Sequence, residues 1–254
     1  MKHEYPPVYR ESRAQARRLG ETKTFKESFQ LNVSCARAIE QAIHNHADED
    51  DSKGFLFDGC ARSVLDEYGF QRTQFVLANT LVAAGSLGFE PDSLRWARMV
   101  LIPPDKDNQK SRVQADRPLL AQFVQQTYAE YQAQGLFGPE HCGAPGQNFA
   151  GKVVVLRPDR LAESSLSPQN LLWLAECGFG CDPNSSGRAV FATCLGDGEK
   201  TRLNRSDFIG VLDEQYLPDW AQEKLTELRA PAQQQEGPVQ EQDSGPAQGG
   251  MEMR

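Results

Sequence analysis

The second half of the chain folds around Cys177-Gly178-Phe179-Gly180-Cys181-Asp182-Pro183-Asn184-Ser185-Ser186-Gly187. The glycines of this stretch permit positive backbone angles, so it is typical of a tight turn with demanding geometry. A strand is expected next over residues 188–195. The turn Gly196-Asp197-Gly198-Glu199 then reverses the chain into a second strand over residues 200–203. The pattern predicts a compact module built around a β-hairpin, and it names no reaction.

Strand and helix signals surround this hairpin. The run Lys152-Val153-Val154-Val155-Leu156 is typical of a buried strand. Ser167 followed by Pro168 indicates an N-cap and the first position of a helix. That helix is expected to carry the apolar residues from Leu171 to Ala175 and to end at Gly178. Two further elements are expected after the hairpin, a short strand over residues 208–212 and an amphipathic helix over residues 218–228.

The N-terminal half shows helical periodicity. Thr24 and Glu27 have the spacing of a capping box, which predicts a helix from Thr24 to about His46. Apolar residues at three-and-four spacing predict further helices and their inward faces. The helix over residues 72–84 is expected to point Asn79 away from its apolar face, and residues 94–102 are ambiguous between helix and strand. The remaining helices are expected over residues 58–68 and 117–134.

The middle of the chain changes composition. Residues 135–151 contain five glycines and two prolines, which is typical of a linker. After the last helix, Gln, Pro, Gly and Glu dominate and leave few large apolar side chains to bury, so a disordered tail is expected. The sequence therefore predicts an α+β protein with a mostly helical domain over 1–138, a linker over 139–151, a small α/β module over 152–228 and a disordered tail over 229–254.

The overall charge limits the classes of function. The chain has 254 residues and a formal net charge of −8, whereas general nucleic-acid binding draws its affinity mainly from cationic contacts to phosphates. No apolar leader is visible at the N-terminus, and the longest apolar-leaning stretch, residues 75–89, is too short to cross a bilayer. A cytoplasmic location without membrane association is therefore expected, with the six cysteines reduced.

Three kinds of chemical site lack part of their usual pattern. Cys177 and Cys181 form one close pair of zinc ligands, but Cys194 stands alone where a structural zinc site needs a second pair. The glycines lie between a helix and a strand, and no Lys-Ser or Lys-Thr follows them, as a phosphate-binding loop requires. Neither Gly-x-Ser-x-Gly nor His-Glu-x-x-His is present. We therefore expect no cofactor and no metal, and we assign no catalytic residue.

A basic surface is the remaining candidate for function. Arg188, Lys200, Arg202 and Arg205 lie on or beside the hairpin, where alternation places several of them on one sheet face. Turn-forming side chains on both sides of Arg205 predict that its cationic side chain is the one left free to contact a partner. The alternative for Arg205 is an internal ion pair, with Asp182 or Asp219.

Several phrases of the sequence resemble a known family. In the first half they are Pro7-Val8-Tyr9-Arg10, Glu27-Ser28-Phe29-Gln30-Leu31-Asn32, Cys35-Ala36-x-Ala38-Ile39, Tyr68-Gly69-x-x-Arg72 and Val76-Leu77-Ala78-Asn79-Thr80. Over about residues 5–135 they resemble the domain-of-unknown-function family numbered 3849. Its members look like accessory proteins of integrative conjugative elements in Gram-positive gut bacteria. Later phrases resemble a second uncharacterised module typical of the same elements; they run from Val153-Val154-Val155-Leu156 through Gly178-Phe179-Gly180-Cys181 and Arg205-Ser206-Asp207-Phe208-Ile209-Gly210 to Leu217-Pro218-Asp219-Trp220-Ala221.

The resemblance implies a genomic setting and carries over no catalytic residues. With the basic hairpin, it predicts a non-enzymatic accessory protein of a mobile genetic element that acts by protein–protein interaction. The expected partner is a protein of the host or of the element. One alternative is a nucleic-acid-binding or host-defence-antagonist protein. A second is a hydrolase in an unfamiliar fold, so the enzymatic status stays open.

Overall fold

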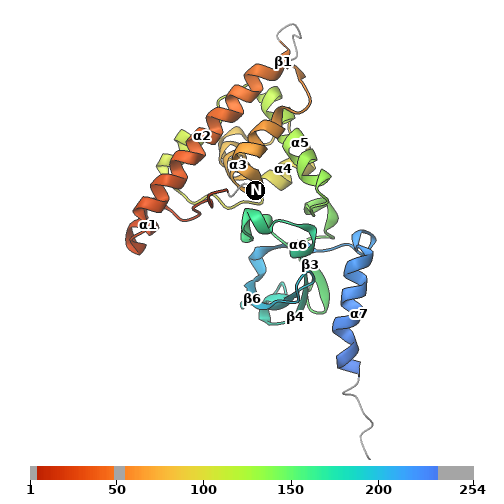
Figure 1. The fold of residues 1–254 in the computed structure, drawn as a ribbon. Helices are drawn as coiled ribbons and strands as arrows, with labels where there is room; N and C mark the ends of the chain where they lie inside the picture. The colour runs from red at the N-terminus through yellow and green to blue at the C-terminus, as the bar shows by residue number, and fades with distance from the viewer. Residues whose placement is uncertain (1–4, 49–54, 234–254) are drawn as a thin grey trace, which may run out of the picture.

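The structure is a computed structural model that describes residues 5–48 and 55–233. Helices form the N-terminal region and an antiparallel sheet forms the C-terminal region, as Figure 1 shows. The predicted α+β fold with a β-hairpin is confirmed. Most of the tail expected to be disordered, residues 234–254, lies outside the described residues. The last helix runs to Gln233, beyond the end predicted for it.

The helical region contains α1 (Arg13–Leu19), α2 (Thr22–His46), α3 (Cys60–Ala84), α4 (Pro91–Ala97) and α5 (Arg117–Ala133), with a two-residue ladder of β1 (Ala47–Asp48) and β2 (Phe55–Leu56). The prediction of a capping box at Thr24 is wrong. Helix α2 begins two residues earlier, at Thr22, and its N-cap residue Glu21 makes no side-chain cap. The inward face predicted for α5 is confirmed, and all of its members are buried: Leu120, Phe123, Val124, Thr127, Tyr128 and Tyr131.

The second half of α3 is the centre of the helical region. The helix bends at Gly69, whose φ of 76° is non-helical, and residues 69–81 are then buried on every side. The expectation that Asn79 lies off the buried face is wrong. Asn79 is 1% exposed, and its Nδ2 donates to the carbonyl oxygen of Asn108 at 2.7 Å and to Ser111 Oγ at 3.2 Å. A 3₁₀ segment, Lys106–Ser111, covers that face.

The ambiguous stretch 94–102 is not a strand. Helix α4 continues through Ala97, and the chain then turns and runs irregularly to the prolines. Glu90 caps α4 by accepting from the backbone N–H groups of Asp92 and Ser93. Arg95 lies in the last turn of α4 and Arg98 is its C-cap residue, where positive charge complements the helix dipole.

The C-terminal region is one antiparallel sheet in the order β6-β5-β4-β3-β7. Its strands are β3 (Lys152–Leu156), β4 (Leu172–Cys177), β5 (Ala189–Cys194), β6 (Lys200–Asn204) and β7 (Phe208–Val211). The helix predicted through Ala175 is wrong. Only α6 (Pro168–Leu171) is helical, and β4 follows at once with four consecutive buried residues. Periodicity cannot separate such a short apolar run from a helix.

The sheet is rolled so that its two edges approach each other. The edge strands β6 and β7 are joined by only three residues, Arg205–Asp207. The edges of a flat five-stranded sheet lie about 19 Å apart, whereas this connection spans at most about 14 Å. The inner face buries its own core, which includes Phe149, Val154, Trp173, Val190 and Phe208. The outer face packs Val153, Val155, Leu172 and Leu174 into the larger core shared with the helices.

The glycine-rich stretch folds tightly over β5. A Cβ atom on Gly178 or Gly180 would collide with the carbonyl oxygens of Ala189 and Arg188, and Gly178 has a φ of 117°. Glycine is therefore required here by close backbone approach as well as by backbone angle. The turn leaves Phe179 78% exposed at the end of the sheet.

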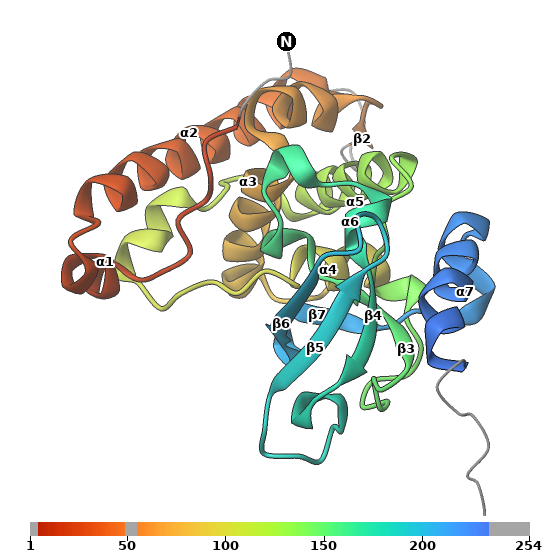
Figure 2. The same cartoon turned by 60° about the horizontal axis from the view of Figure 1, so that its bottom comes forward.

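Helix α7 (Asp219–Gln233) lies beside the sheet on the β3 side (Figure 2). Ala221 and Leu225 are buried, and Arg229 Nη2 donates to the carbonyl oxygen of Gly151 at 3.2 Å. No helix within residues 5–48 and 55–233 is both long and apolar enough to span a membrane.

Candidate binding groove

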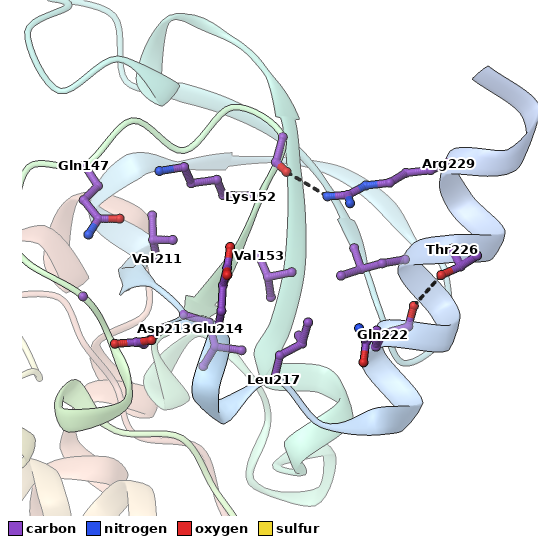
Figure 3. A pocket seen from close by; sticks show the side chains of 14 residues that line it. Gln147, Lys152, Val153, Val211, Asp213, Glu214, Leu217, Gln222, Thr226 and Arg229 are labelled. Carbon is purple, nitrogen blue, oxygen red and sulfur yellow. Dashed lines mark hydrogen bonds between the residues drawn. The ribbon is translucent and has the colours of Figure 1, made fainter. Parts of the chain in front are cut away.

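One large cavity lies between the sheet and α7 (Figure 3). It has a volume of about 760 Å³, and the ends of β3 and β7 form one wall. Figure 3 shows Lys152 and Arg229 among its lining residues, together with the acidic Asp213 and Glu214. Because both signs of charge line this open cleft, it does not select a ligand by charge.

A second cavity, of about 800 Å³, follows the edge strand β7, and a neighbouring cavity of about 420 Å³ shares five lining residues with it. We define the residues that line these two cavities as the arginine groove. Neither lining contains an aspartate or a glutamate, although the chain carries a net charge of −8. Positive side chains enter the groove from five places in the sequence: Arg95, Arg98, Arg157, Arg188 and Arg205.

The groove is built from both regions of the protein. Arg95 and Arg98 come from the end of α4, Arg157 follows β3, and Arg188 precedes β5. The register between β3 and β7 shifts, so that Leu156 faces Phe208 and Val155 faces Gly210. Ile209 therefore has no partner in the ladder, which is a bulge on an edge strand. Ile209 lines both cavities and gives the groove an apolar floor.

The arginines differ in how far their charge is already matched. Arg157 donates to both carboxylate oxygens of Asp159, at 3.0 and 2.8 Å. Arg95 forms an exposed ion pair with Asp92, and Arg98 Nη2 donates to the carbonyl oxygen of Leu81. Arg188 is exposed, and its side chain makes no hydrogen bond or ion pair with another residue in the part of the chain that the structure describes. Arg188 thus carries the most available positive charge of the groove.

The prediction that the side chain of Arg205 is free is wrong. Its guanidinium donates to the carbonyl oxygens of Gly180, Cys181 and Gln147 at 2.8, 2.8 and 2.7 Å. It also stacks over the ring of Phe149, 3.8 Å from the centroid. These neutral partners replace the predicted ion pair as well. Arg205 therefore holds the glycine-rich turn against the chain at Gln147, and a role in binding a partner stays a prediction.

The four candidate cations divide into two groups. Arg188 and Arg205 line the groove, whereas Lys200 and Arg202 lie outside it along β6. Lys200 Nζ lies 3.3 Å from Glu176 Oε1, and Arg202 is exposed. Sequence reasoning missed Arg95, Arg98 and Arg157. These residues lie far from the hairpin in the chain, and no local motif marks them.

The phrases that carry the family resemblance fold into an internal network. Arg72 is 2% exposed, and its guanidinium donates to the carbonyl oxygens of Ser28, Pro6 and Pro7 at 3.0, 2.8 and 3.1 Å and also to Asn32 Oδ1. The backbone N–H of Tyr9 donates to Ser28 Oγ at 2.8 Å. These contacts hold the segment before α1, which we call the N-terminal arm, against α2 and α3. The residues of the family phrases therefore have a packing role in this structure.

Nucleophile and metal chemistry find little support among the described residues. Burial raises the pKa of Cys142, the cysteine of the groove, to about 12, so its thiol is protonated at neutral pH and a weak nucleophile. Cys181 and Cys194 are buried in the core on the inner face of the sheet, and Cys177 is exposed. No group of three His, Cys, Asp or Glu side chains within residues 5–48 and 55–233 could hold a metal ion.

Fold and groove together define an α+β protein whose helical region and rolled sheet share one basic groove. The model of a family described as "Protein of unknown function (DUF3849)" matches residues 8–132, from the N-terminal arm into α5. The resemblance to this domain-of-unknown-function family is thereby confirmed for that region. No curated protein and no solved structure matches the chain.

Proposed function

We propose that this protein is a non-enzymatic accessory protein that binds another protein, and that the arginine groove receives an acidic segment of its partner. The observation that carries the proposal is the lining of the groove, which holds five arginines and no acidic residue on an acidic chain. Guanidinium groups bind carboxylates through paired, charge-assisted hydrogen bonds. The family resemblance supports the setting of a mobile genetic element. In that setting the partner is a protein of the element or of its host.

A protein partner is favoured over nucleic acid on two grounds. A net charge of −8 repels a long polyanion outside the groove, which weakens the electrostatic attraction that nucleic-acid binding requires. The aromatic rings of the groove, Phe149 and Phe208, are 4% and 6% exposed, so they offer bases no surface for stacking. A short acidic segment needs neither an extended basic surface nor exposed rings.

The test is equilibrium binding of a fluorescein-labelled octaglutamate peptide and of an eight-residue oligothymidylate to the full chain. The groove variant combines Arg95→Glu and Arg188→Glu. The control combines Arg18→Glu and Arg37→Glu, two exposed arginines of α1 and α2, and so changes the net charge equally. We expect the groove variant to lose at least about tenfold in peptide affinity and the control to keep most of it. Equal losses in both variants, or tighter binding of the oligothymidylate than of the peptide, would contradict the proposal.

A further inference from the structure

The two edge strands of the rolled sheet, β7 and β6, differ in whether their outer backbone groups are paired with another segment of the chain. The C-terminal end of the β7 edge is paired, because Cys142 and Leu212 form an isolated antiparallel β-bridge and the N–H of Gly143 donates to the carbonyl oxygen of Val211 at 3.0 Å. No strand in the described part of the chain pairs with the outer edge of β6. An edge strand with unpaired backbone groups is a template for pairing with another extended chain.

The ladder identifies which backbone groups of β6 face outward. Arg205 N–H donates to the carbonyl oxygen of Arg188, and Cys194 N–H donates to that of Glu199. In an antiparallel ladder residues alternate between facing the partner strand and facing away, so Lys200, Arg202 and Asn204 face outward. The N–H of Asn204 is already bonded to Asp207 Oδ2 at 2.8 Å. Lys200 and Arg202 therefore offer the accessible N–H and C=O groups.

The side chains beside this edge select the charge of a partner. Arg202 is exposed and stands opposite Phe191, which is 46% exposed on the same face of the sheet. A second copy of this chain would bring Lys200 and Arg202 against the same cations, and like charges directly opposite each other are destabilising. The charge of Lys200 is partly matched by Glu176, whereas Arg202 has no ion pair among the described residues. An acidic strand complements this edge.

We propose that β6 binds an extended acidic segment by strand addition, and that the segment continues past Asn204 into the arginine groove. Asn204, the last residue of β6, lines the groove together with Arg188, so the edge and the groove meet there. This inference rests on the proposed function for the nature of the partner and adds how the partner is held. Main-chain hydrogen bonds to Lys200 and Arg202 supply the affinity of such a complex, and side-chain charge supplies its specificity.

The experiment compares three forms of one labelled peptide, Glu-Val-Glu-Val-Glu-Val-Glu-Glu-Glu: the unmethylated peptide and two forms that are N-methylated at alternate residues, one in each register. N-methylation removes main-chain donors and keeps every charge. Binding to the wild-type chain should fall at least about tenfold when the methylated register faces β6. Equal affinity for the unmethylated peptide and both methylated registers would overturn strand addition, whatever happens to any variant.

Variants of the protein give a second, independent reading. Arg202→Pro removes an outward N–H that makes no ladder bond, so an edge strand tolerates it. Arg202→Gln removes the same charge and keeps that N–H. We expect Arg202→Pro to bind the peptide at least about fivefold more weakly than Arg202→Gln, with an unchanged circular dichroism spectrum. Equal binding by these two variants would contradict the inference.

The outcomes separate this inference from the proposed function. Loss of binding in the Arg95→Glu, Arg188→Glu variant alone leaves the groove as the site and overturns strand addition. Weaker binding in the groove variant and in the β6 experiments (the N-methylated peptides and Arg202→Pro) supports both the proposed function and strand addition. Unchanged binding in all of these experiments overturns both. Concentration-dependent dimers of the wild-type chain that Arg202→Pro abolishes would make a second copy the occupant and overturn the acidic partner.

Discussion

Glu163 caps the helical segment that begins at Phe70, although the two residues lie 93 positions apart in the chain. Its carboxylate accepts from the backbone N–H groups of Phe70 and Gln71 at 2.6 and 2.9 Å. The bend at Gly69 leaves these groups without partners inside the helix, and a carboxylate at a helix N-terminus also complements its dipole. Glu163 precedes β4, so this cap ties the sheet region to the central helix.

Removing the cap should destabilise the fold. We expect Glu163→Ala to lower the free energy of unfolding by about 2 kcal/mol, because two buried N–H groups lose their acceptor. Glu163→Gln keeps an amide oxygen in place and should cost clearly less. Urea denaturation of the three proteins at neutral pH measures the difference, and similar losses for the Ala and Gln variants would contradict capping by the side-chain oxygen.

The same carboxylate should make stability depend on pH. Burial raises the pKa of Glu163 above its ordinary value of 4.5, and the hydrogen bonds from Gln71 and Phe70 offset only part of this. A raised pKa in the folded state means that the contribution to stability is complete below about pH 4.5 and is lost as the pH rises through the folded-state pKa. The unfolding free energy of the wild type relative to Glu163→Gln should therefore fall from pH 4.5 toward neutrality. A difference that rises over this range would contradict the assignment.

Gly69 should tolerate a methyl group less well than another glycine of similar backbone conformation. Gly69 has φ 76° and ψ 169°, and Gly85 has φ 74° and ψ −166°, but a Cβ on Gly69 would lie 2.9 Å from Glu163 Cδ, whereas a Cβ on Gly85 would approach only Arg117 Nη2, at 3.6 Å. We expect Gly85→Ala to cost about 2 kcal/mol through the backbone angles alone, and Gly69→Ala to cost at least about 1 kcal/mol more. Thermal denaturation of both variants checks this, and equal costs would show that Glu163 moves aside freely.

Arg205 should stabilise the sheet region in a way that Arg202 does not. Arg205→Ala leaves three carbonyl oxygens without their donor and removes the contact with Phe149, so we expect a loss of about 3 kcal/mol. Arg202→Ala alters an exposed side chain and should change stability by less than about 0.5 kcal/mol. Comparable midpoints of unfolding for the two variants would contradict this structural role and indicate that the side chain of Arg205 is free.

The sequence identified elements whose pattern is local. The inward face of α5 follows from helical periodicity, and β3 and the hairpin follow from apolar runs bounded by turn residues. The error at β4 has a clear cause, since a short apolar run buried on both faces has no period. Asn79 was misplaced because the helix around it is buried on every side, and the segment that covers it begins near residue 106.

The groove could be predicted only in part. Arg188 was accessible to sequence reasoning because it adjoins the hairpin, whereas Arg95 and Arg157 reach the same cavities only once α4 and the end of β3 meet. The carbonyl oxygens that bind Arg205 belong to residues 147, 180 and 181, and backbone acceptors leave no mark in a sequence. A cluster of charges from distant parts of the chain is therefore seen only in the structure and cannot be predicted from local sequence patterns.

Site-specific photo-crosslinking in the cells that naturally produce this protein tests the central claim most directly. A photoreactive phenylalanine analogue replaces Ile209, which lines both cavities of the groove, and in a control it replaces Leu87, which is 79% exposed in the helical region. The account predicts that position 209 crosslinks to an acidic segment of a protein, that position 87 does not, and that adding Arg95→Glu and Arg188→Glu removes the crosslink. Crosslinks from position 209 to nucleic acid, or the same protein crosslinks from both positions, would contradict it.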